Sequence, residues 1–331
     1  LGAGFMGGTH ARAYAKLPDV EIAAIYAHSG NRAEPLVAEV GGVWTADIDS
    51  ILRDDSIDAV DICLPTPEHR SSFEAALQTG KHILLEKPLA LTREDARAIV
   101  DAASASDQLV MIAHVLRFWP EYVALQKIVA SGELGRPISG FASRRQPYPA
   151  WSPLFAKGTM TGGAIVDQMI HDYDALNWIF GQPRTVSAHG TLNPRSNGLD
   201  QSQVLIGYDE ASGTTDGGMV MPDSYPFSAR LDTLCERGSI EYFLRAGGRS
   251  FEVGVPQNVL TMYRSEDDPE VVEVEQTDAY ENETAYFIEC VRSGVRPERG
   301  TPDESYTALE VALAAKFSAE SGEQIALADW R

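Results

Sequence analysis

The chain has 331 residues, of which 44% are hydrophobic and 23% are charged, a composition typical of folded globular proteins. This length is about twice that of a common domain, so we predict two domains, each with its own core. The formal net charge is −21, from 27 Lys and Arg against 48 Asp and Glu, and such a surface repels phosphate backbones and anionic lipid. We therefore expect neither nucleic acid nor a membrane as partner. The sequence contains no run of about 18 apolar residues, so we predict no transmembrane helix.

The chain contains three widely spaced cysteines, Cys63, Cys235 and Cys290, without a Cys-x-x-Cys pair. This sparse, odd set argues against a disulfide framework and a thiolate metal site, so we expect a reducing, cytoplasmic compartment and no metal. The chain opens at Leu1 on a glycine motif that normally follows a strand. We expect that strand, and any leader segment, to precede Leu1.

Predicted strands and helices alternate over about the first 115 residues. Apolar, β-prone runs predict strands at 20–26, 59–64, 82–85 and 109–114, and helical spacing predicts helices at 10–17, 31–40, 68–79 and 92–105. Thr92 and Asp95 resemble a capping box, and Gly80 is placed to end a helix. Strands separated by helices of this length indicate βαβ crossovers and a parallel sheet.

The pattern changes after Trp119. Helices are predicted at 121–131 and 163–180, with a loop between them that contains residues 144–151, and two further helices are predicted at 280–293 and 303–321. Alternating apolar and polar residues predict strands at 184–192, 201–208, 228–235 and 238–244. These strands favour a mostly antiparallel sheet, with a domain boundary near residues 116–120.

The first residues carry a dinucleotide-binding pattern. Gly2, Gly4 and Gly7 form Gly-x-Gly-x-x-Gly, and Phe5 and Met6 lie between the last two glycines. In such motifs the first glycine permits a tight turn, the second lets a pyrophosphate approach the backbone, and the third lets the helix pack closely. The following helix offers its free N–H groups to phosphate. The motif therefore indicates NAD or NADP binding, and the alternative is a purely structural turn.

The end of the next strand bears on the choice of cofactor. Proteins that bind NAD usually place Asp or Glu about 20 residues after the glycines, where it binds the ribose 2′-hydroxyl. Here Ala27 takes that place, and His28, Ser29 and Arg32 follow it. Without a carboxylate nearby, a 2′-phosphate meets no repulsion and these side chains can donate to it, so the sequence favours NADP over NAD. The alternative is that Arg32 faces solvent on its helix.

Two segments are candidates for chemistry at the ends of strands. Lys87, in Glu86-Lys87-Pro88, follows a parallel strand at the edge where open α/β sheets bind ligands. A lysine there can donate to a substrate hydroxyl and stabilise negative charge on its oxygen, whereas the alternative is an ordinary surface salt bridge. Pro65, Thr66 and His69 follow another such strand, and we expect them, together with Glu86 and Lys87, to contact the cofactor.

A polar stripe is predicted on the helix over 163–180. At about 100° per residue, Asp167, His171 and Asp174 fall within about 40° of one another. Two carboxylates beside a histidine fix its tautomer and raise its pKa, as a general base requires. The alternatives are an exposed helix face and, with too few ligands to favour it, a metal site. Gly162-Gly163 before this helix would let substrate approach its positive end, and the loop 144–151 could flank a sugar-sized pocket.

Together these residues resemble the glucose–fructose oxidoreductase and inositol dehydrogenase (Gfo/Idh/MocA) family. The matching segments span the whole chain: 2–14, 62–90, 116–122, 132–137, 162–181 and 237–243. The resemblance implies an α/β protein with a Rossmann domain over 1–117 and an α+β domain over 118–331, built on a large, mostly antiparallel open sheet. It also implies that the helix at about 303–321 packs back on the first domain and that the chains form homodimers or homotetramers.

The resemblance also implies roles for single residues. Lys87, Asp167 and His171 correspond to the catalytic residues of the family, and Arg117 and Trp151 are expected to join them in binding substrate. His171 would take the proton of a substrate hydroxyl, Lys87 would steady its oxygen, and Asp167 would hold a neighbouring hydroxyl. Ala27 departs from the family's NAD pattern, and the segment 114–118 lacks the Asn that many members carry before the Arg-Phe pair.

These inferences predict an NAD(P)-dependent dehydrogenase of a sugar, polyol or related cyclic alcohol. One alternative is a glycoside-cleaving enzyme that holds an NAD, transiently reduces it and shows no net cofactor turnover. A second is a non-catalytic regulator that senses dinucleotide, but such a protein needs neither Lys87 nor His171.

Overall fold

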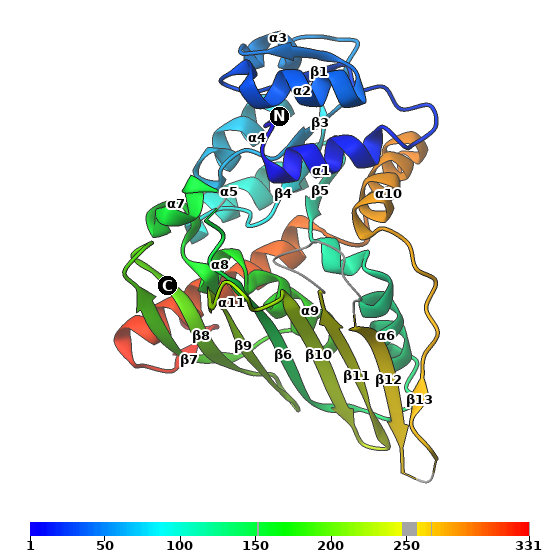
Figure 1. Ribbon diagram of the computed structural model, residues 1–331, viewed down its shortest axis with the longest axis vertical. Coiled ribbons are helices and arrows are strands. Elements are labelled where there is room, and N and C mark those ends of the chain that lie inside the picture. The colour runs from blue at the N-terminus through cyan, green and yellow to red at the C-terminus, as the bar shows by residue number, and fades with distance from the viewer. Residues whose placement is uncertain (151, 247–256, 266, 331) are drawn as a thin grey trace. The chain divides into compact units, whose positions relative to one another are not determined.

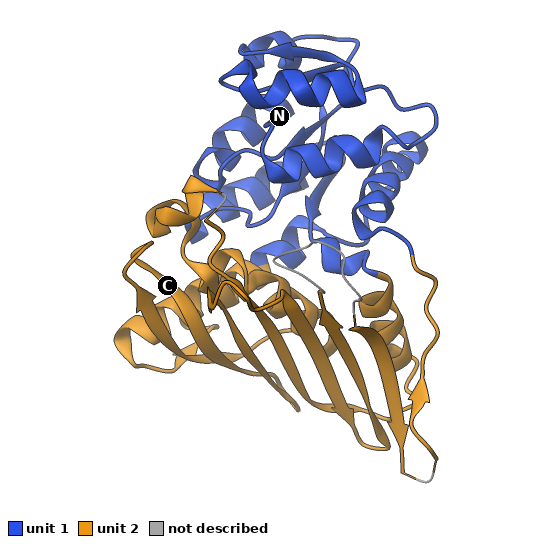
Figure 2. Cartoon of the chain, viewed as in Figure 1, with its two compact units in different colours: residues 1–119, 277–306 blue, residues 120–276, 307–331 orange. Residues whose placement is uncertain are grey.

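The chain folds into two compact units in a computed structural model that describes residues 1–150, 152–246, 257–265 and 267–330 (Figure 2). Unit 1 comprises Leu1–Trp119 with Thr277–Tyr306, and unit 2 comprises Pro120–Gln276 with Thr307–Arg331. The architecture is α/β, with a Rossmann domain followed by a domain built on a large, mostly antiparallel sheet, which confirms the predicted fold class.

Unit 1 is built on parallel strands, as predicted (Figure 1). One sheet pairs β1 (Ala24–Tyr26) with β2 (Val43–Thr45), and the other has the order β3 (Ala59–Ile62), β4 (His82–Glu86), β5 (Val110–Ala113). The helices of this unit are α1 (Phe5–Tyr14), α2 (Gly30–Val40), α3 (Ile48–Leu52), η1 (Thr66–Glu68), α4 (His69–Gln78), α5 (Arg93–Ser104), η2 (Val115–Arg117) and α10 (Ala279–Ser293). The first helix starts earlier than predicted. Strand β2 and helix α3 were not predicted, because they are too short for a hydrophobic periodicity to be recognised.

The backbone of the first two residues links the two sheets of unit 1. The Gly2 N–H donates to the Tyr26 carbonyl at 2.9 Å, and the Leu1 carbonyl accepts from the Cys63 N–H at 2.8 Å. Because Tyr26 ends β1 and Cys63 directly follows β3, the glycine loop is held at the carboxyl ends of both strands.

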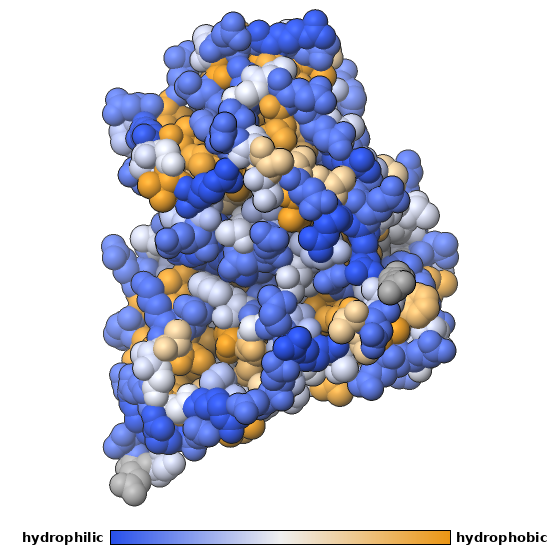
Figure 3. All heavy atoms as spheres, turned by 180° about the vertical axis from the view of Figure 1, so that it is seen from behind, coloured by the Kyte–Doolittle hydropathy of each residue, from blue (hydrophilic) through white to orange (hydrophobic). Residues whose placement is uncertain are grey.

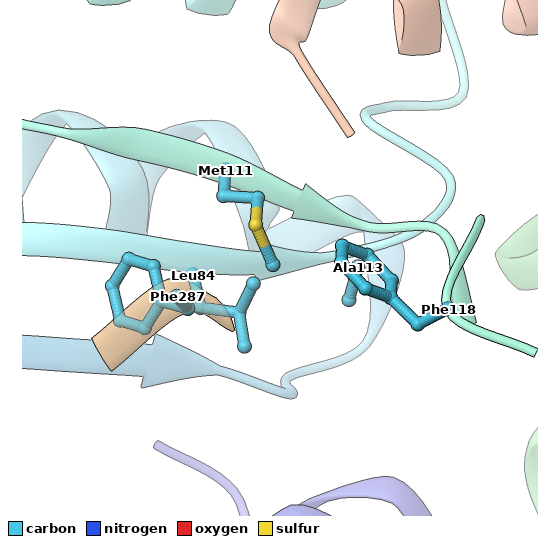
Figure 4. Close-up of a cluster of buried hydrophobic side chains, with 5 residues drawn as sticks. All are labelled: Leu84, Met111, Ala113, Phe118 and Phe287. Atoms are coloured by element: carbon cyan, nitrogen blue, oxygen red, sulfur yellow. The ribbon is translucent and has the colours of Figure 1, made fainter. Parts of the chain in front are cut away.

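Helix α10 belongs to unit 1, although the sequence placed residues 118–331 in the second domain. The side chain of Phe287 on α10 packs in a buried cluster with side chains from β4 and β5 (Figure 4). The cluster consists of Leu84, Met111, Ala113, Phe118 and Phe287. In addition, Asn282 Nδ2 donates to the Phe118 carbonyl at 3.1 Å. These contacts explain why 277–306 group with the first domain.

Unit 2 is built on a nine-stranded sheet (Figure 1) with the order β13-β12-β11-β10-β6-β9-β8-β7-β14. Its strands are β6 (Pro137–Pro147), β7 (Thr185–Asn193), β8 (Gly198–Gly207), β9 (Ser212–Met221), β10 (Ser228–Cys235), β11 (Gly238–Arg245), β12 (Gln257–Arg264), β13 (Glu270–Val271) and β14 (Ile325–Ala326). Only β6 and β9 pair in parallel among these neighbours, so the predicted mostly antiparallel sheet is confirmed.

Residues 144–147 lie in β6, which corrects the predicted loop over 144–151. This strand contains Pro137 and adjacent arginines, and β9 is rich in glycine, so neither shows the apolar alternation that marks a strand. Trp151, a predicted substrate contact, lies outside the described residues.

The helices of unit 2 cover one face of the sheet. They are α6 (Pro120–Ala130), η3 (Pro153–Ala156), α7 (Gly158–Thr161), α8 (Ala164–Asp167), α9 (Ile170–Phe180) and the larger part of α11 (Pro302–Ser321). Gly140 of β6 and Gly213 of β9 let α9 approach, since a Cβ at either would lie 2.8 or 3.0 Å from Leu176. On β8, Val204 is buried whereas Gln203 and Leu205 are exposed, so the opposite face of the sheet is uncovered.

Helix α11 is divided between the units rather than packed on the first domain alone. Residues 302–306 group with unit 1 and residues 307–321 with unit 2. Within unit 2 its Ser318 Oγ accepts a hydrogen bond from the Ala188 N–H of β7 at 2.9 Å. No local sequence pattern predicts this division, because both parts lie in one unbroken helical pattern.

The outer surface is largely polar, in keeping with the net charge. Hydrophilic residues predominate on the side shown in Figure 3, and apolar residues form separate patches between them. Over the described ranges, none of the helices combines the length and apolar character needed to cross a bilayer.

Candidate cofactor and active site

The three motif glycines meet different surroundings in unit 1. A Cβ at Gly7 would lie 1.9 Å from the Gly2 carbonyl oxygen, and one at Gly2 would lie 2.6 Å from the Cys63 carbonyl oxygen. In contrast, a Cβ at Gly4 would meet nothing within 4 Å. Gly2 and Gly7 are thus required by packing, whereas Gly4 borders open space directly before α1.

The N-terminus of α1 fits a dinucleotide phosphate. Gly4 is its N-cap residue, no side chain caps it, and no acidic residue lies in its first turn. The exposed Phe5 and the half-buried Met6 form that turn, so their N–H groups and the positive end of the helix dipole lie beside the open space at Gly4. These residues fit the pyrophosphate of NAD or NADP.

Two glycine variants are expected to separate folding from binding. Gly7→Ala should destabilise unit 1, because its Cβ overlaps a backbone oxygen at 1.9 Å, whereas Gly4→Ala should fold normally. Gly4→Ala should still weaken dinucleotide binding about tenfold or more, because its methyl group occupies the approach to the helix. Thermal melting and fluorescence titration with NADPH measure the two effects. A Gly4→Ala protein that binds as the parent does would contradict this assignment.

The segment after β1 presents the predicted 2′-site. His28, Ser29 and Arg32 are exposed, and Ala27 is half-buried. Two aromatic residues fix this turn: the Tyr26 hydroxyl lies 3.0 Å from His28 Nδ1, and Trp44 Nε1 donates to the Ala27 carbonyl at 3.1 Å. Trp44, on β2, is a contact that sequence reasoning missed, because β2 is too short and exposed to be recognised.

His69 does not face open space, which corrects its predicted contact with the cofactor. It is 1% exposed, with Nδ1 at 2.8 Å from the Pro88 carbonyl and Nε2 at 2.9 Å from the Leu64 carbonyl. Burial lowers the pKa of His69. The imidazole therefore ties together the loops that follow β3 and β4, where the half-buried Pro65 and the buried Thr66 begin the next turn.

Lys87 directly follows β4 and is half-buried between two buried neighbours. The Lys87–Pro88 peptide bond is cis. Glu86 is buried, and its Oε1 lies 3.6 Å from His10 Nε2 of α1, whereas its contact with the cofactor stays a prediction. The link that His69 makes to Pro88 fixes the loop that carries the lysine.

Arg117 is also placed differently from the prediction. It is 2% exposed, and its Nη1 donates to Glu304 Oε1 at 2.5 Å within unit 1. Arg299 Nη1 in turn donates to the Arg117 carbonyl at 3.4 Å. This partly buried ion pair ties η2 to the first turn of α11, whereas contact of Arg117 with substrate stays a prediction.

In unit 2, Asp167 and His171 flank a break between two helices. Asp167 ends α8, α9 begins at Ile170, and the Met169 N–H bonds to the Ala164 carbonyl five residues earlier. The continuous helix predicted over 163–180 is therefore wrong, and widened turns of this kind are frequent at functional sites. Asp167 and His171 are both half-buried, whereas Asp174 is buried.

Asp200 of β8 holds the start of α8. Its Oδ1 accepts from the Ala164 N–H at 3.0 Å, and its Oδ2 accepts from Asn193 Nδ2 at 2.9 Å and Ser196 Oγ at 2.5 Å. A Cβ at Gly163 would lie 2.8 Å from the Leu199 nitrogen. This glycine therefore serves close packing against β8, and the predicted approach of substrate to this helix end is corrected.

A buried ion pair holds the start of α9. Arg144 of β6 donates to Asp172 through Nη2 at 3.1 Å and Nε at 3.3 Å, and its Nη2 also donates to the Tyr122 hydroxyl at 3.3 Å. Burial raises the pKa of Tyr122 to about 12. Asp172 adjoins His171, so this pair fixes the helix turn that carries the histidine. No local sequence pattern predicts this pair, since Arg144 falls in the predicted loop over 144–151.

Comparison with known proteins gives consistent matches along the chain. Residues 1–114 match the oxidoreductase family with an NAD-binding Rossmann fold, and residues 122–241 match the GFO/IDH/MocA C-terminal domain. The chain is 30% identical over 347 aligned residues to a scyllo-inositol 2-dehydrogenase (NAD(+)) of Bacillus subtilis, covering 99% of this chain and 95% of that protein.

Two further matches agree with the first. An inositol 2-dehydrogenase of Streptomyces avermitilis is 27% identical over 340 residues, covering 98% of this chain and 92% of that protein. The fold is similar to the crystal structure of a putative myo-inositol dehydrogenase from Sinorhizobium meliloti, with a TM-score of 0.81, 23% identity and 98% of both chains covered.

Proposed function

Because the chain belongs to the Gfo/Idh/MocA family of oxidoreductases and is an NAD(P)-dependent enzyme acting on CH–OH groups, we propose that it oxidises a ring hydroxyl of a cyclic polyol or sugar. The observation that carries this proposal is the alignment, over 99% of the chain, with a relative named for scyllo-inositol. Both structural halves support it: Lys87 follows β4 in unit 1, and Asp167 and His171 flank the helix break in unit 2.

In the proposed reaction each residue has a separate task. His171 accepts the proton of the substrate hydroxyl at an imidazole nitrogen, and Lys87 donates a hydrogen bond to the same oxygen as negative charge develops there. Asp167 accepts a hydrogen bond from a neighbouring hydroxyl and so orients the ring. The bound nicotinamide supplies the C4 position that takes up the hydride. The glycine loop with Phe5 and Met6 would hold its pyrophosphate.

The proposal is tested by initial rates with a panel of inositol isomers, hexoses and anhydrosugars, each with NADP⁺ and NAD⁺. Stoichiometric formation of reduced nicotinamide with at least one cyclic polyol or sugar is expected. His171→Ala should lower that rate about 10²–10⁴-fold. Cleavage of a glycoside without net cofactor reduction would instead support the alternative in which a held NAD is transiently reduced.

We infer that the enzyme prefers NADP. The turn after β1 offers exposed His28, Ser29 and Arg32 and no carboxylate at Ala27, which suits a 2′-phosphate. Ala27→Asp should therefore lower the NADPH-to-NADH affinity ratio about tenfold or more, because a carboxylate repels the phosphate and can bind the ribose hydroxyl.

Ala27→Asn is the matched control, since it has the same size without the charge. Fluorescence titrations with NADPH and NADH give the ratio for both variants. An equal ratio in Ala27→Asp and Ala27→Asn would exclude charge as the determinant. Preference of the parent protein for NADH would overturn the inference on NADP while leaving the proposed dehydrogenase activity intact.

We further propose that the uncovered face of the nine-stranded sheet joins chains into homodimers or homotetramers. Apolar side chains on this face are 40–58% exposed, namely Leu205, Leu234, Val259 and Val271. Light scattering after size-exclusion chromatography measures the association, and Leu205→Asp should shift it toward monomer. The three cysteines are free thiols, in keeping with the proposed location in the reducing cytoplasm.

A further inference from the structure

A cluster of metal-ligating side chains lies in unit 1 beside the glycine loop, with His10 buried and Asp61 and Cys63 half-buried. His10 of α1 approaches the end of β3, where Asp61 lies on the strand and Cys63 directly follows it, two residues further on. The His10 Nδ1–Asp61 Oδ2 distance is 2.8 Å, Cys63 Sγ–Asp61 Oδ1 is 3.1 Å, and Cys63 Sγ–His10 Nδ1 is 3.6 Å. Among the residues that the structure describes, these three form the one such group whose ligand atoms all lie within 4.8 Å of one another.

A second observation concerns Glu283 of α10, which is completely buried. Its Oε2 lies 3.8 Å from His10 Nε2, and neither carboxylate oxygen makes a hydrogen bond within the described structure. An ionised carboxylate in this position lacks a donor, and a protonated one lacks an acceptor. Burying such a group without a partner is unfavourable, so the site calls for a compensating group that the described residues do not supply.

The charges around His10 point to a cation. The buried Glu86 also faces this ring, with Oε1 at 3.6 Å from Nε2, so Asp61, Glu86 and Glu283 surround a single imidazole. Even an imidazolium carries one positive charge against the carboxylates of Asp61 and Glu86, before Glu283 is counted. A divalent ion on the Nδ1 side balances the excess and leaves Nε2–H directed at the carboxylates of Glu86 and Glu283. Carboxylates hold metal-bound histidines in this way at many zinc sites.

We propose that His10, Asp61 and Cys63 bind one divalent transition-metal ion of the zinc type. Nitrogen, oxygen and thiolate sulfur together suit Zn²⁺, and bonds of about 2.0–2.3 Å place neighbouring ligand atoms about 3–4 Å apart. The three observed separations of 2.8–3.6 Å need only a small adjustment to meet this geometry. Binding displaces the Cys63 thiol proton and the His10 Nδ1 proton that is shared with Asp61; the thiol proton goes to solvent, and the Nδ1 proton goes to solvent from an imidazolium or is replaced by one on Nε2 in a neutral ring. The ion joins α1 to the end of β3, and no redox change is involved.

The sequence predicted no metal site, and the positions of the three ligands in the chain explain why. Asp61 lies on β3, Cys63 directly follows this strand and His10 lies on a helix, with no spacing that resembles a known zinc motif. In this assignment the ion has a structural role, because it stabilises the loop that carries Gly2, Gly4 and Gly7. The proposal is independent of the substrate and of the choice between NAD and NADP.

The test uses the full-length protein with no polyhistidine tag, freed of metal by a chelator and then titrated with Zn²⁺ and with Co²⁺. One equivalent of Zn²⁺ per chain is expected by elemental analysis after dialysis, together with a thiolate-to-cobalt charge-transfer absorption for the Co²⁺ form. Cys63→Ser should abolish that absorption and weaken Zn²⁺ binding about 100-fold or more, and Glu283→Gln should weaken it about 10–100-fold.

Cys235→Ser is the matched control, because it removes a buried thiol from unit 2 and should leave both readouts unchanged. Thermal melting shows whether Cys63→Ser is folded: without metal it should melt as the parent does, and Zn²⁺ should raise the melting temperature of the parent only. Zn²⁺ uptake that is equal in the parent and in Cys63→Ser would overturn the proposal. Absence of a bound equivalent in the parent would overturn it as well.

Discussion

Lys87→Ala is expected to lower turnover about 10²–10⁴-fold while cofactor affinity stays within a few fold. The side chain follows β4 at the edge of a parallel sheet where ligands bind, and its ammonium stabilises charge on the reacting oxygen in the transition state. Binding of the dinucleotide depends on the glycine loop instead, so the loss should appear in kcat. Steady-state rates and an NADPH titration on the same preparation give the two quantities.

Lys127→Ala is a suitable control, since Lys127 is an exposed lysine on α6 in the other unit and should keep parental turnover. Lys87→Arg retains the positive charge but changes its geometry, and we expect it to recover only part of the rate. A Lys87→Ala enzyme with parental kcat would remove the lysine from the mechanism. A large loss of cofactor affinity with little change in kcat would assign it to binding.

Arg144→Met is expected to lower the free energy of unfolding by about 3–5 kcal/mol, because it leaves the carboxylate of Asp172 buried without its partner. Both side chains lie almost entirely inside unit 2, at 8% and 1% exposure. Urea denaturation measures the effect. Because Asp172 adjoins His171, the same variant should lose activity at urea concentrations at which it is still folded.

The exposed pair Arg53–Asp49, whose side chains are 75% and 56% exposed, provides a matched control. Arg53→Met should change the unfolding free energy by less than about 1 kcal/mol. The double replacement Arg144→Met with Asp172→Leu removes both charges and should regain much of the lost stability. If Arg144→Met is as mild as Arg53→Met, the buried pair does not anchor α9.

Local patterns were enough to predict the core of unit 1. The buried strands β3 to β5 are continuous apolar runs, and Thr92 caps α5 by accepting from the Asp95 N–H at 3.1 Å, as its spacing predicted. The glycine motif was equally clear, because Gly2 and Gly7 meet close backbone contacts and Gly4 borders open space. Strand-end position and helical spacing singled out Lys87, Asp167 and His171 as candidates, and the family resemblance then implied their catalytic roles.

Long-range contacts account for most of the features that the sequence did not predict. Nothing in the local pattern of Ala279–Ser293 says that Phe287 packs against Leu84 and Met111, so α10 was assigned to the wrong domain. The break after Asp167 follows from the capping of Ala164 by Asp200, which lies on another strand.

The direction in which side chains point was the second feature that the sequence could not predict. His69, Glu86 and Arg117 all stand at places where a ligand contact was reasonable from the sequence. Their side chains turn inward, to the backbone carbonyls of Leu64 and Pro88, to His10 and to Glu304 respectively. Whether a polar residue at a strand end faces ligand or interior depends on neighbours that only the fold brings near.

The return of α10 to unit 1 has a consequence for how the protein is made. A ribosome that has released residues 1–119 has supplied the described strands of unit 1 but not Phe287, which packs against Leu84 and Met111. Part of the interior of the nascent unit therefore stays exposed until residues 277–306 have emerged. For the same reason a fragment ending at Trp119 should be prone to aggregation, because unit 1 completes its core only after a segment more than 150 residues further along the chain has been made.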